Sequence, residues 1–548
     1  MSEKAAWWQK STVYQIYPRS FADSNGDGIG DIAGIISRLD YLQDLGIDVI
    51  WLSPIFASPM DDNGYDISDY QDIAPEFGTL ADFDRLVAEA KARGIGILLD
   101  LVVNHTSDEH RWFRDARASR TARYRDFYVW RDPAPGGGVP TDLKSVFGGP
   151  AWTLDGATGQ YYLHQFSRRQ PDLNWDNPEL RAEIYRMMAW WQARGIAGFR
   201  MDVIDLIGKD VDRGITANGP RLHDYLQEMH RETFGGKDLL TVGEAWSATP
   251  ESALLYSGRD RGELSMVFQF EHVAQQWHDV WGKWQPRPFD LVAFKRVIDR
   301  WQLGLAEDGW NSLFWGNHDL PRAVSKYGDD ADHHAASAKM LATVLHFLKG
   351  TPYVYQGEEI GMTNVPFHSI EQYRDIETLN MYAEHVAAGL SPADFIAGAN
   401  ANGRDNARTP MQWSNAPHGG FTTGTPWIEA NPNHDRINVA TQQGDGHSIL
   451  AHYRRLIALR KGLPVMQMGR YEPCLSDHPA VMAYTRRLEG QRILVVANFT
   501  AAPQTVALPP ELTGIGKVLI GNFPRQGKLD RNVDLAPFEG FAILFGAD

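Results

Sequence analysis

Short apolar runs alternate with amphipathic stretches along most of the chain. The runs are rich in Val, Ile and Leu, which is typical of strands covered on both faces, and the stretches between them place apolar residues at helical spacing. Helices are predicted near residues 34–45 and over "LADFDRLVAEAKARG" (80–94) and "PELRAEIYRMMAWWQARG" (178–195). Strands are predicted within residues 12–21, 46–55, 95–105, 195–208, 238–246, 264–270, 311–319 and 351–359.

Eight strand-and-helix units in succession predict a (β/α)8 TIM barrel. An open doubly wound sheet is the alternative, but no glycine-rich nucleotide fingerprint follows the first strand. The interval 106–173 is too long for an ordinary loop, so a small inserted domain is expected after strand 3. From about residue 470 the pattern changes to short strands separated by turns. The predicted division is a barrel over 1–105 and 174–470, an inserted domain over 106–173, and a C-terminal antiparallel β-sandwich domain over 471–548.

Polar residues collect at the predicted carboxyl ends of the strands, where the active site of such a barrel lies. Arg200 and Asp202 are two positions apart on the fourth strand, so their side chains share one face. Asp202, Glu244 and Asp319 end three different strands and would meet at one mouth. A carboxylate cluster suits a hard metal ion or the hydrolysis of a glycoside. Zinc is poorly supported, because neither a His-x-x-x-His pair nor a second cysteine accompanies the cluster.

Composition narrows the class of ligand. The chain of 548 residues carries a net charge of −16, which argues against nucleic acid as a partner. Its 18 Trp residues favour a sugar, because aromatic rings stack on sugar rings. The single cysteine, Cys474, excludes an intramolecular disulfide, and no stretch resembles a secretion signal or a membrane span. We therefore expect a cytoplasmic protein, monomer or homodimer, with a small oligosaccharide as its partner and no membrane contact.

Four segments in order carry a resemblance to a known family. They are "DLVVNH", "GFRMDVI", "TVGEAW" and "FWGNHD", which resemble the signature regions of the α-amylase superfamily, glycoside hydrolase family 13. Further segments are similar to its oligo-1,6-glucosidase, dextran glucosidase and α-glucosidase branch: "GYDISDY", "QPDLNW", "YQGEEIG" and "RDNARTPMQW". The resemblance covers essentially the whole chain. It implies a retaining, exo-acting α-glucosidase that releases α-glucose from the non-reducing end of short α-glucosides through a covalent glucosyl-enzyme.

The resemblance also implies catalytic roles. Asp202 would be the nucleophile, Glu244 the acid/base, and Asp319 the stabiliser of the transition state. Arg200 would keep Asp202 ionised, since a nearby cation lowers the pKa of a carboxyl group. The sequence neighbours of Glu244 are apolar or small, so desolvation would raise its pKa, as an acid requires.

The remaining site residues are implied in the same way. His105 and His318 would hydrogen-bond the first sugar, and Tyr65 would stack on it. Asp62 and Arg404 would close the pocket, with Arg408 as the alternative to Arg404. Phe147 and Phe166 would line the pocket, the alternative being plain core packing. The implied substrate-binding set is Asp62, Tyr65, His105, Phe147, Phe166, Arg200, Val203, His318 and Arg404.

Val203, directly after the predicted nucleophile, bears on linkage. In the branch that this chain resembles, valine at this position goes with α-1,6 linkages, and Thr or Ala with α-1,4 linkages. Short α-1,6-linked isomaltooligosaccharides are therefore the expected substrates. The alternatives are an α-1,4-preferring α-glucosidase or transglucosylase acting on maltose or sucrose, and a trehalose-6-phosphate hydrolase, which needs a cationic phosphate pocket. Sucrose isomerases carry an Arg/Asp-rich loop that is missing here, and non-catalytic transporter partners have lost the carboxylates that this chain keeps.

The loop "DSNGDGIGD" (23–31) carries oxygen donors at the spacing of a calcium loop. The positions are 1, 3, 5, 7 and 9, occupied by Asp23, Asn25, Asp27, Ile29 through its carbonyl group, and Asp31. It is not an EF-hand, since position 12 is Gly34 rather than Glu. The branch resemblance implies structural Ca²⁺, with Mg²⁺ possible, and the alternative is an Asx-rich turn without a metal.

Overall fold

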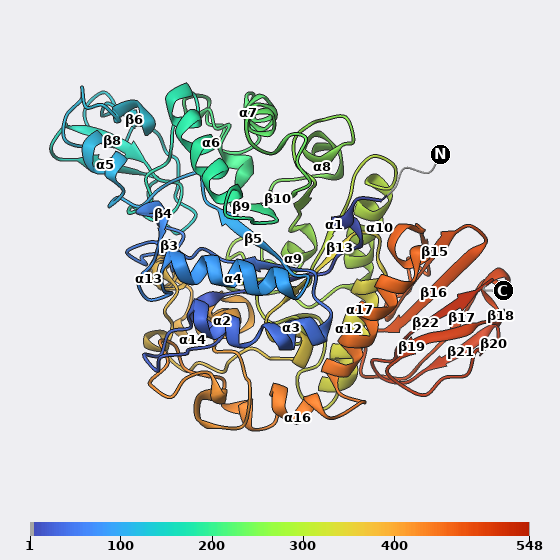
Figure 1. Ribbon diagram of the computed structural model, residues 1–548. Coiled ribbons are helices and arrows are strands. Elements are labelled where there is room, and N and C mark those ends of the chain that lie inside the picture. The colour runs from blue at the N-terminus through green and yellow to red at the C-terminus, as the bar shows by residue number, and fades with distance from the viewer. Residues whose placement is uncertain (1–4, 547–548) are drawn as a thin grey trace.

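Eight parallel strands form the centre of the molecule, which the computed structural model describes over residues 5–546 (Figure 1). Their order is β11-β10-β9-β5-β2-β1-β13-β12, and a parallel bridge between Val267 and Asn311 joins the two ends. The strands are β1 (Val13–Ile16), β2 (Val49–Leu52), β5 (Gly96–Leu101), β9 (Gly198–Met201), β10 (Leu240–Glu244), β11 (Met266–Phe268), β12 (Ser312–Leu313) and β13 (Thr351–Tyr355). The predicted (β/α)8 barrel is confirmed, because each expected strand segment supplies one strand of a closed sheet.

At least one helix follows each barrel strand. Two of them begin with strong caps: Thr79 and Asp82 form a capping box at α4, and Asn177 accepts hydrogen bonds from the first amides of α6 with Pro178 in its first turn. The helix expected near 34–45 is two helices that meet at Arg38. The helices between the strands are α2 (Ile32–Ser37), α3 (Leu39–Leu45), α4 (Leu80–Ala92), α6 (Pro178–Gln192), α7 (Leu222–Met229), α8 (Pro250–Ser257), α10 (Leu291–Gly304), α12 (His334–Phe347) and α17 (Ile449–Gly462).

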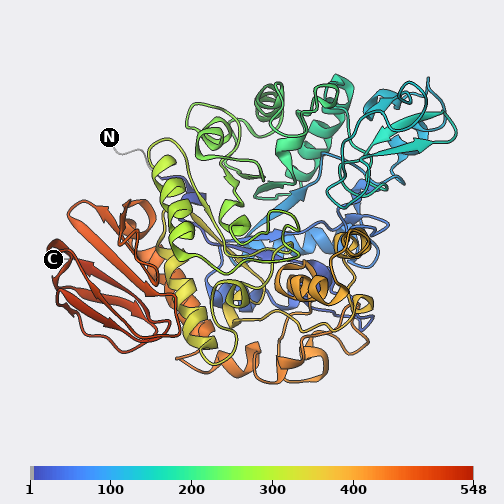
Figure 2. The same ribbon diagram turned by 180° about the vertical axis from the view of Figure 1, so that it is seen from behind.

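Residues 106–173 leave the barrel between β5 and β9 and project to one side of it (Figures 1 and 2). They form the helix α5 and a three-stranded antiparallel sheet in the order β6-β8-β7. Bridges between His105 and Asp172 and between Tyr128 and Leu173 tie the two ends of the segment together beside the barrel. The elements are α5 (Arg111–Ala116), β6 (Trp130–Arg131), β7 (Trp152–Asp155) and β8 (Gln160–Leu163).

Antiparallel strands fill the C-terminal part, coloured red in Figure 1, as the sequence predicted. The Tyr484 hydroxyl donates to the Val344 carbonyl at 2.6 Å, and Arg486 donates to the Phe347 carbonyl at 2.5 Å, so this part is anchored on α12. One sheet consists of β14 (Arg470–Cys474), β15 (Val481–Leu488), β16 (Gln491–Asn498), β22 (Gly540–Phe545) and β19 (Lys517–Gly521). The two-stranded pairs are β17 (Gln504–Ala507) with β21 (Asn532–Leu535), and β18 (Gly514–Ile515) with β20 (Lys528–Leu529).

Shorter elements fill the loops around the barrel mouth. They are β3 (Phe56–Ala57) and β4 (Asp69–Ile73) after β2, α9 (Glu271–Ala274) after β11, α11 (Ala323–Tyr327) after β12, and α13 (Ile376–Ala387), α14 (Pro392–Asn402), α15 (Asp405–Arg408), α16 (Val439–Gln443) and α18 (Pro464–Met468) after β13. Within residues 5–546, no helix is both long enough and apolar enough to cross a membrane.

Candidate active site

A cavity of about 580 Å³ lies at the carboxyl ends of the barrel strands. It is lined by all but two of the predicted catalytic and substrate-binding residues, namely Asp62, Tyr65, His105, Phe147, Phe166, Asp202, Val203, Glu244, Asp319 and Arg404. The two exceptions, Arg200 and His318, are fully buried and contact lining residues from behind. The tertiary fold therefore gathers the predicted set around one opening.

Arg200 is the centre of a buried ion cluster. Its Nη1 donates to Asp100 at 2.8 Å and to Asp202 at 2.9 Å, and its Nη2 donates to Glu244 at 2.5 Å. The register of the barrel explains the cluster, because Asp100 of β5 lies beside Arg200 of β9 in the parallel ladder. Asp202 follows two positions later on the same face, and Glu244 ends the neighbouring strand β10.

Three buried carboxylates share a single guanidinium in this cluster. Burial raises the pKa of Asp202 well above its ordinary value, and although Arg200 lowers it, the charges of Glu244 and Asp100 add to the rise. Burial also raises the pKa of Asp100 to about 6. The expectation that Arg200 keeps Asp202 ionised is therefore wrong, because burial and the other carboxylates outweigh its effect on the pKa of Asp202. The cluster carries more negative than positive charge, which disfavours the ionised form of Asp202 and of Asp100.

The surroundings of Glu244 also differ from the expectation. Its carboxylate accepts hydrogen bonds from Arg200, from the backbone amide of Val203 at 3.2 Å, and from the indole of Trp246 at 2.8 Å. The apolar environment expected from its sequence neighbours is wrong, because two of these donors come from β9 and the residues after it. Local sequence cannot reveal a donor that a neighbouring strand supplies.

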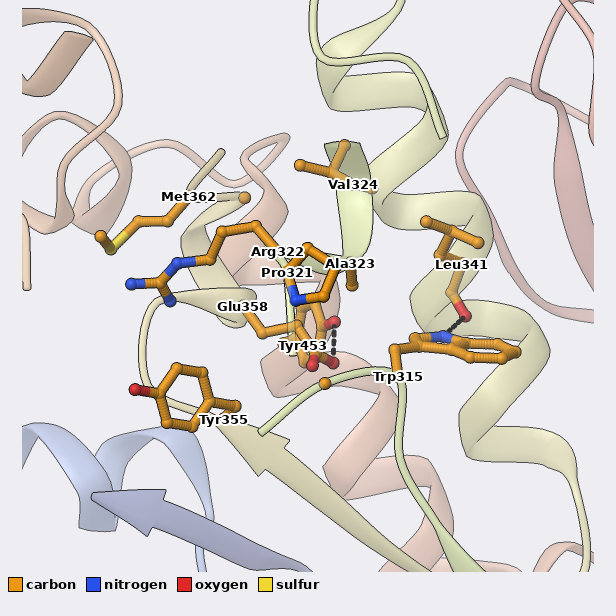
Figure 3. Close-up of a pocket in the computed structure, with 13 residues that line it drawn as sticks. Trp315, Pro321, Arg322, Ala323, Val324, Leu341, Tyr355, Glu358, Met362 and Tyr453 are labelled. Atoms are coloured by element: carbon orange, nitrogen blue, oxygen red, sulfur yellow. Dashed lines mark hydrogen bonds between the residues drawn. The ribbon is translucent and has the colours of Figure 1, made fainter. Parts of the chain in front are cut away.

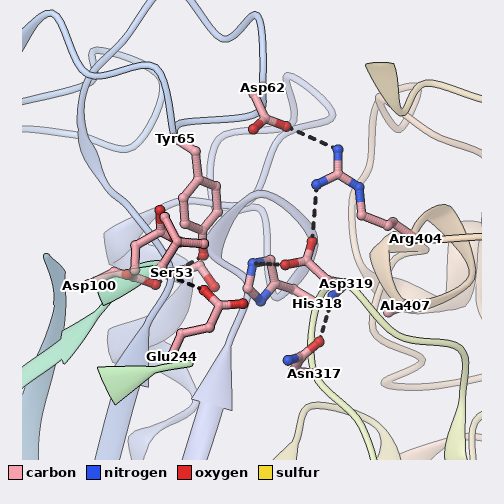
Figure 4. A network of polar contacts seen from close by, with 12 residues as sticks. Ser53, Asp62, Tyr65, Asp100, Glu244, Asn317, His318, Asp319, Arg404 and Ala407 are labelled. Atoms are coloured by element: carbon pink, nitrogen blue, oxygen red, sulfur yellow. Dashed lines mark hydrogen bonds and ion pairs between the residues drawn. The ribbon is translucent and has the colours of Figure 1, made fainter. Parts of the chain in front are cut away.

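Asp319 lies in a strongly cationic environment (Figure 4). Arg408 donates to its Oδ1 at 2.8 Å and Arg404 to the same oxygen at 3.3 Å, while His318 lies 3.1 Å from its Oδ2. Burial acts to raise the pKa of Asp319, but these three neighbours outweigh burial and hold the pKa well below its ordinary value. Asp319 is therefore ionised at neutral pH.

Arg404 spans the rim of the cavity. Its Nη2 donates to Asp62 at 3.2 Å and to Asp375 at 2.5 Å, and its Nη1 reaches Asp319 (Figure 4). The partner of Asp62 is thus Arg404, whereas the alternative, Arg408, lies against Asp319 and the carbonyl group of His318. Burial raises the pKa of Asp62 to about 7 even with Arg404 beside it.

Tyr65 lines the cavity and stacks on His318, which lies behind it. Their rings are parallel to within 5°, with centroids 5.2 Å apart, and the Tyr65 hydroxyl donates to Asp100 at 3.0 Å. Burial lowers the pKa of His318 to about 3 and that of His105 to about 4, so both imidazoles are neutral near pH 7. The Nδ1 of His318 lies 2.8 Å from the Gln15 amide, which fixes the ring.

Val203 adopts a left-handed backbone conformation, with φ 33° and ψ 46°. This is costly for a β-branched residue and is found where the surroundings impose it. Here the conformation directs the amide of Val203 to Glu244 and leaves the side chain on the cavity wall. The backbone conformation of Val203 therefore links the two predicted catalytic carboxylates, since it follows Asp202 and binds Glu244.

Aromatic side chains surround the cavity. Phe147 and Phe166 meet edge to face at 5.4 Å, and the Arg404 guanidinium lies 4.8 Å above the Phe147 ring. Both phenylalanines line the cavity, so core packing does not account for them. Trp246, which the sequence analysis did not single out for the site, stacks on Phe270 with ring centroids 3.9 Å apart and lines the outer part.

Other residues of the site were not among the predicted ligands. Asp100 and Asp375 each bind an arginine of the site, and nothing in the sequence around either residue indicates this contact. Gln15 and Arg408 carry no sequence signal of their contacts with His318 and Asp319. These pairings join segments far apart in the chain.

Another, much smaller cavity of about 20 Å³ is lined by residues that follow the ends of β12 and β13 (Figure 3). It is lined by Arg322, Glu358 and Tyr453 among others, and the Tyr453 hydroxyl donates to Glu358 at 2.8 Å. Burial raises the pKa of Glu358 to about 8. The space suffices for a water molecule but not for a sugar.

The predicted metal loop is closed by its own hydrogen bonds. Asp23, Asn25 and Asp27 each accept from amides two or more residues ahead, which turns their oxygen atoms into the loop. Asp31 instead caps α2 through Gly34 and accepts from Ser24. Within the described residues, no group of three or more His, Cys, Asp or Glu side chains is close enough to hold a metal ion. The donors fit a hard cation in kind, but binding would need the Asn25 amide and the Ile29 carbonyl as well.

A closed (β/α)8 barrel with buried carboxylates on its strand ends defines the class as a barrel enzyme with the groups of a glycosidase. The family described as "Alpha amylase, catalytic domain" matches residues 15–469, and "Maltogenic Amylase, C-terminal domain" matches residues 471–542. The chain therefore belongs to the α-amylase family, and the predicted family and its glycoside hydrolase class are confirmed.

Named relatives are similar over nearly their whole length. The chain is 57% identical to palatinase from Erwinia rhapontici, covering 98% of each chain, and 55% identical to oligo-1,6-glucosidase from Halalkalibacterium halodurans, covering 92% of each. Among solved structures, trehalose-6-phosphate hydrolase from Bacillus licheniformis superposes with a TM-score of 0.95 at 45% identity, covering 98% of this chain and 100% of that one.

Proposed function

We propose that the protein is an exo-acting, retaining α-glucosidase that removes α-glucose from the non-reducing end of short α-1,6-linked oligosaccharides. The observation that carries the proposal is the pairing of Asp202 and Glu244 on adjacent nitrogens of one guanidinium, that of Arg200. Retaining enzymes need two carboxyl groups only about 5–5.5 Å apart, and a shared arginine holds two such groups close together.

In the first step, the Asp202 carboxylate attacks the anomeric carbon while Glu244 gives a proton to the departing glycosidic oxygen. The bond to the leaving saccharide breaks and a glucosyl ester of Asp202 forms. The mechanism needs one proton distributed over two carboxyl groups.

In the second step, Glu244 takes a proton from water, and the water oxygen attacks the anomeric carbon from the face that the leaving group vacated. The ester bond to Asp202 breaks and α-glucose is released, since two inversions restore the configuration. Asp319, ionised beside Arg404 and Arg408, would bind ring hydroxyls and favour the positive charge that develops on the sugar.

The exo mode is supported by the closed end of the cavity. Asp62, Arg404 and Asp375 form a buried ion-pair chain at the rim, and Phe147 covers the Arg404 guanidinium. A chain of sugars could not continue past this wall, so a terminal glucosyl unit would fill it. Tyr65 and His105, which line the same end, would contact that unit.

The α-1,6 preference is supported by the relative named oligo-1,6-glucosidase and by Val203 on the cavity wall. The test compares kcat/KM on isomaltose and maltose for the wild-type protein and for Val203→Thr. We expect isomaltose to be the better substrate and Val203→Thr to narrow the ratio. A wild-type enzyme that clearly prefers maltose would overturn the proposed linkage and leave the α-1,4 alternative.

A trehalose-6-phosphate hydrolase is the second candidate, since a solved relative has that name and two lysines line the outer cavity. However, Lys283 pairs with Glu377 at 2.6 Å, and burial lowers the pKa of Lys326 to about 7. Neither offers a strong free cation to a phosphate. Hydrolysis of trehalose 6-phosphate at a higher kcat/KM than isomaltose would favour this candidate.

Two further proposals concern the protein outside its active site. The loop of residues 23–31 would bind a structural calcium ion, or magnesium, which suits its oxygen donors and is not required for the chemical steps. A cytoplasmic location is supported by the presence of a single cysteine, Cys474, which leaves no internal disulfide to be formed.

A further inference from the structure

Asp205 is a buried carboxylate that the catalytic scheme leaves without a role. It lies in the short turn η3 (Ile204–Leu206), three positions after Asp202, and its side chain is only 1% exposed. It nevertheless lines the large cavity, beside Glu244, Trp246 and Ser247. A charged group at this depth needs partners, because burial without them is costly.

A chain of hydrogen bonds holds one oxygen of Asp205 in place. The Ser247 hydroxyl donates to Oδ2 at 2.6 Å, and the Asn218 side-chain amide donates to that hydroxyl at 2.7 Å. Asn218 is itself held by the hydroxyl of Tyr256 at 2.5 Å. The orientation of the Asp205 carboxylate is therefore fixed by a chain of three residues, Ser247, Asn218 and Tyr256.

The other oxygen, Oδ1, has no hydrogen-bond partner among the described residues. A buried acceptor left unpaired costs about 1–3 kcal/mol, which a ligand hydroxyl can recover. Burial raises the pKa of Asp205 to about 6, so near pH 7 the group is mostly an ionised acceptor. Its chemistry suits a hydroxyl donor.

The position of Asp205 identifies which sugar would supply that hydroxyl. Asp62, Tyr65 and Arg404 line the closed end, where the terminal glucosyl unit would lie. Glu244 would protonate the bond to the next sugar. Ser247 follows Glu244 by three positions and donates to Asp205, and both residues line the cavity together with Trp246, so we place them on the side of the leaving saccharide.

We propose that Asp205 is a specificity-determining residue that accepts a hydrogen bond from a hydroxyl group of the leaving saccharide. This inference rests on the proposed function and extends it to the second sugar. Asp205 would distinguish substrates that share the glucosyl unit but differ in the leaving group attached to it. An aryl leaving group, which has no hydroxyl to donate, would gain nothing from Asp205.

The test measures kcat/KM on isomaltose and on an aryl α-glucoside for the wild-type protein, Asp205→Asn and Ser247→Ala. In Asp205→Asn the ratio of the two values, isomaltose over aryl glucoside, should fall about tenfold, the effect of losing one charge-assisted hydrogen bond, chiefly through KM for isomaltose. Ser247→Ala, which releases Oδ2, should lower the ratio less. A ratio within about twofold of wild type in Asp205→Asn, for a folded variant, would overturn the inference.

Asp212→Asn is the matched control, since Asp212 is exposed, pairs with Arg131 and is absent from the cavity wall. It should leave the ratio unchanged. If Asp205→Asn does not fold, the Ser247→Ala ratio decides, and an unchanged ratio there also overturns the inference. A wild-type enzyme inactive on isomaltose would instead defeat the proposed function, so the two failures are distinguishable.

Discussion

Arg404 donates to Asp62 across 3.2 Å, although 342 positions separate the two residues in the chain. The same guanidinium also pairs with Asp319, Asp375 and Glu377, so one buried cation contacts four carboxylates at the rim of the cavity. This arrangement joins the loop after β2, the loop after β12 and the long segment after β13.

Arg404→Met should destabilise the protein and reduce its activity. Removing the cation leaves Asp62, Asp319 and Asp375 buried with less compensation, and breaking a buried ion pair costs about 3–5 kcal/mol. Urea unfolding gives the loss of stability, and KM for the aryl glucoside should rise with it. A variant as stable as the wild type would show that Arg404 contributes no net stabilisation to the rim.

Asp202→Asn should abolish turnover while keeping the fold. Loss of a nucleophile lowers kcat by at least about 10³-fold. Because the Arg200 cluster carries excess negative charge, removing one carboxylate should leave the melting temperature equal or higher. Turnover of an aryl α-glucoside and thermal unfolding measure the two effects. Substantial residual hydrolysis would show that another group forms the covalent intermediate.

The first sugar released from any α-glucoside should be the α-anomer. Two successive displacements at the anomeric carbon restore its configuration. Proton NMR during the first minutes of hydrolysis, before mutarotation, distinguishes the anomers. An initial excess of β-glucose would require water to attack directly and would exclude Asp202 as the nucleophile.

Asp62 should make the protein less stable as the pH rises. Its folded pKa, about 7, lies above the unfolded value of about 3.9, so the folded state binds the proton more tightly. The stabilisation that comes from this tighter proton binding is complete below about pH 4 and is lost between about pH 4 and 7. Asp62→Asn removes this dependence, so from about pH 5 to 8 wild type should lose at most about 3 kcal/mol relative to the variant.

Two other groups serve as checks on that experiment. The pKa of Asp319 is depressed in the folded protein, so its contribution to stability is present above its unfolded pKa and is lost only as the pH falls below that value. Asp319 therefore adds no pH dependence to the stability between about pH 5 and 8. The stability of Asp212→Asn should depend on pH as that of the wild type does. The hydrogen bond from Arg131 lowers the pKa of Asp212, so this group also stays ionised over that range. Parallel curves for wild type and Asp62→Asn would contradict the prediction.

Chelation should lower the melting temperature if the loop of residues 23–31 binds a cation. Added Ca²⁺ should restore it, since a ligand that binds only the folded state stabilises it. Asp27→Asn, an exposed change in the loop, should reduce the Ca²⁺ response, whereas Asp212→Asn should retain it. A melting temperature insensitive to chelator and to both metals would leave the loop as an Asx-rich turn.

Much of the site could be predicted because barrel strands carry their chemistry at their carboxyl ends. Arg200 and Asp202 share a strand face, and their contact at 2.9 Å follows from local geometry alone. The environment of Glu244 could not be predicted in this way. Its donors, Arg200 and the Val203 amide, lie on and directly after β9, and the left-handed turn at Val203 has no signature in the side chains around it.

The sequence by itself determined the eight strand-and-helix units, the change to antiparallel strands near residue 470, and the carboxylates that end the strands. These follow from periodicity and position, which are local properties of the chain. Only the tertiary structure decided the charge balance: three carboxylates around Arg200, four around Arg404, and an unpaired oxygen on Asp205. The physical reason is that burial and Coulomb interactions depend on distances between residues that the barrel brings together, and no local pattern encodes those distances.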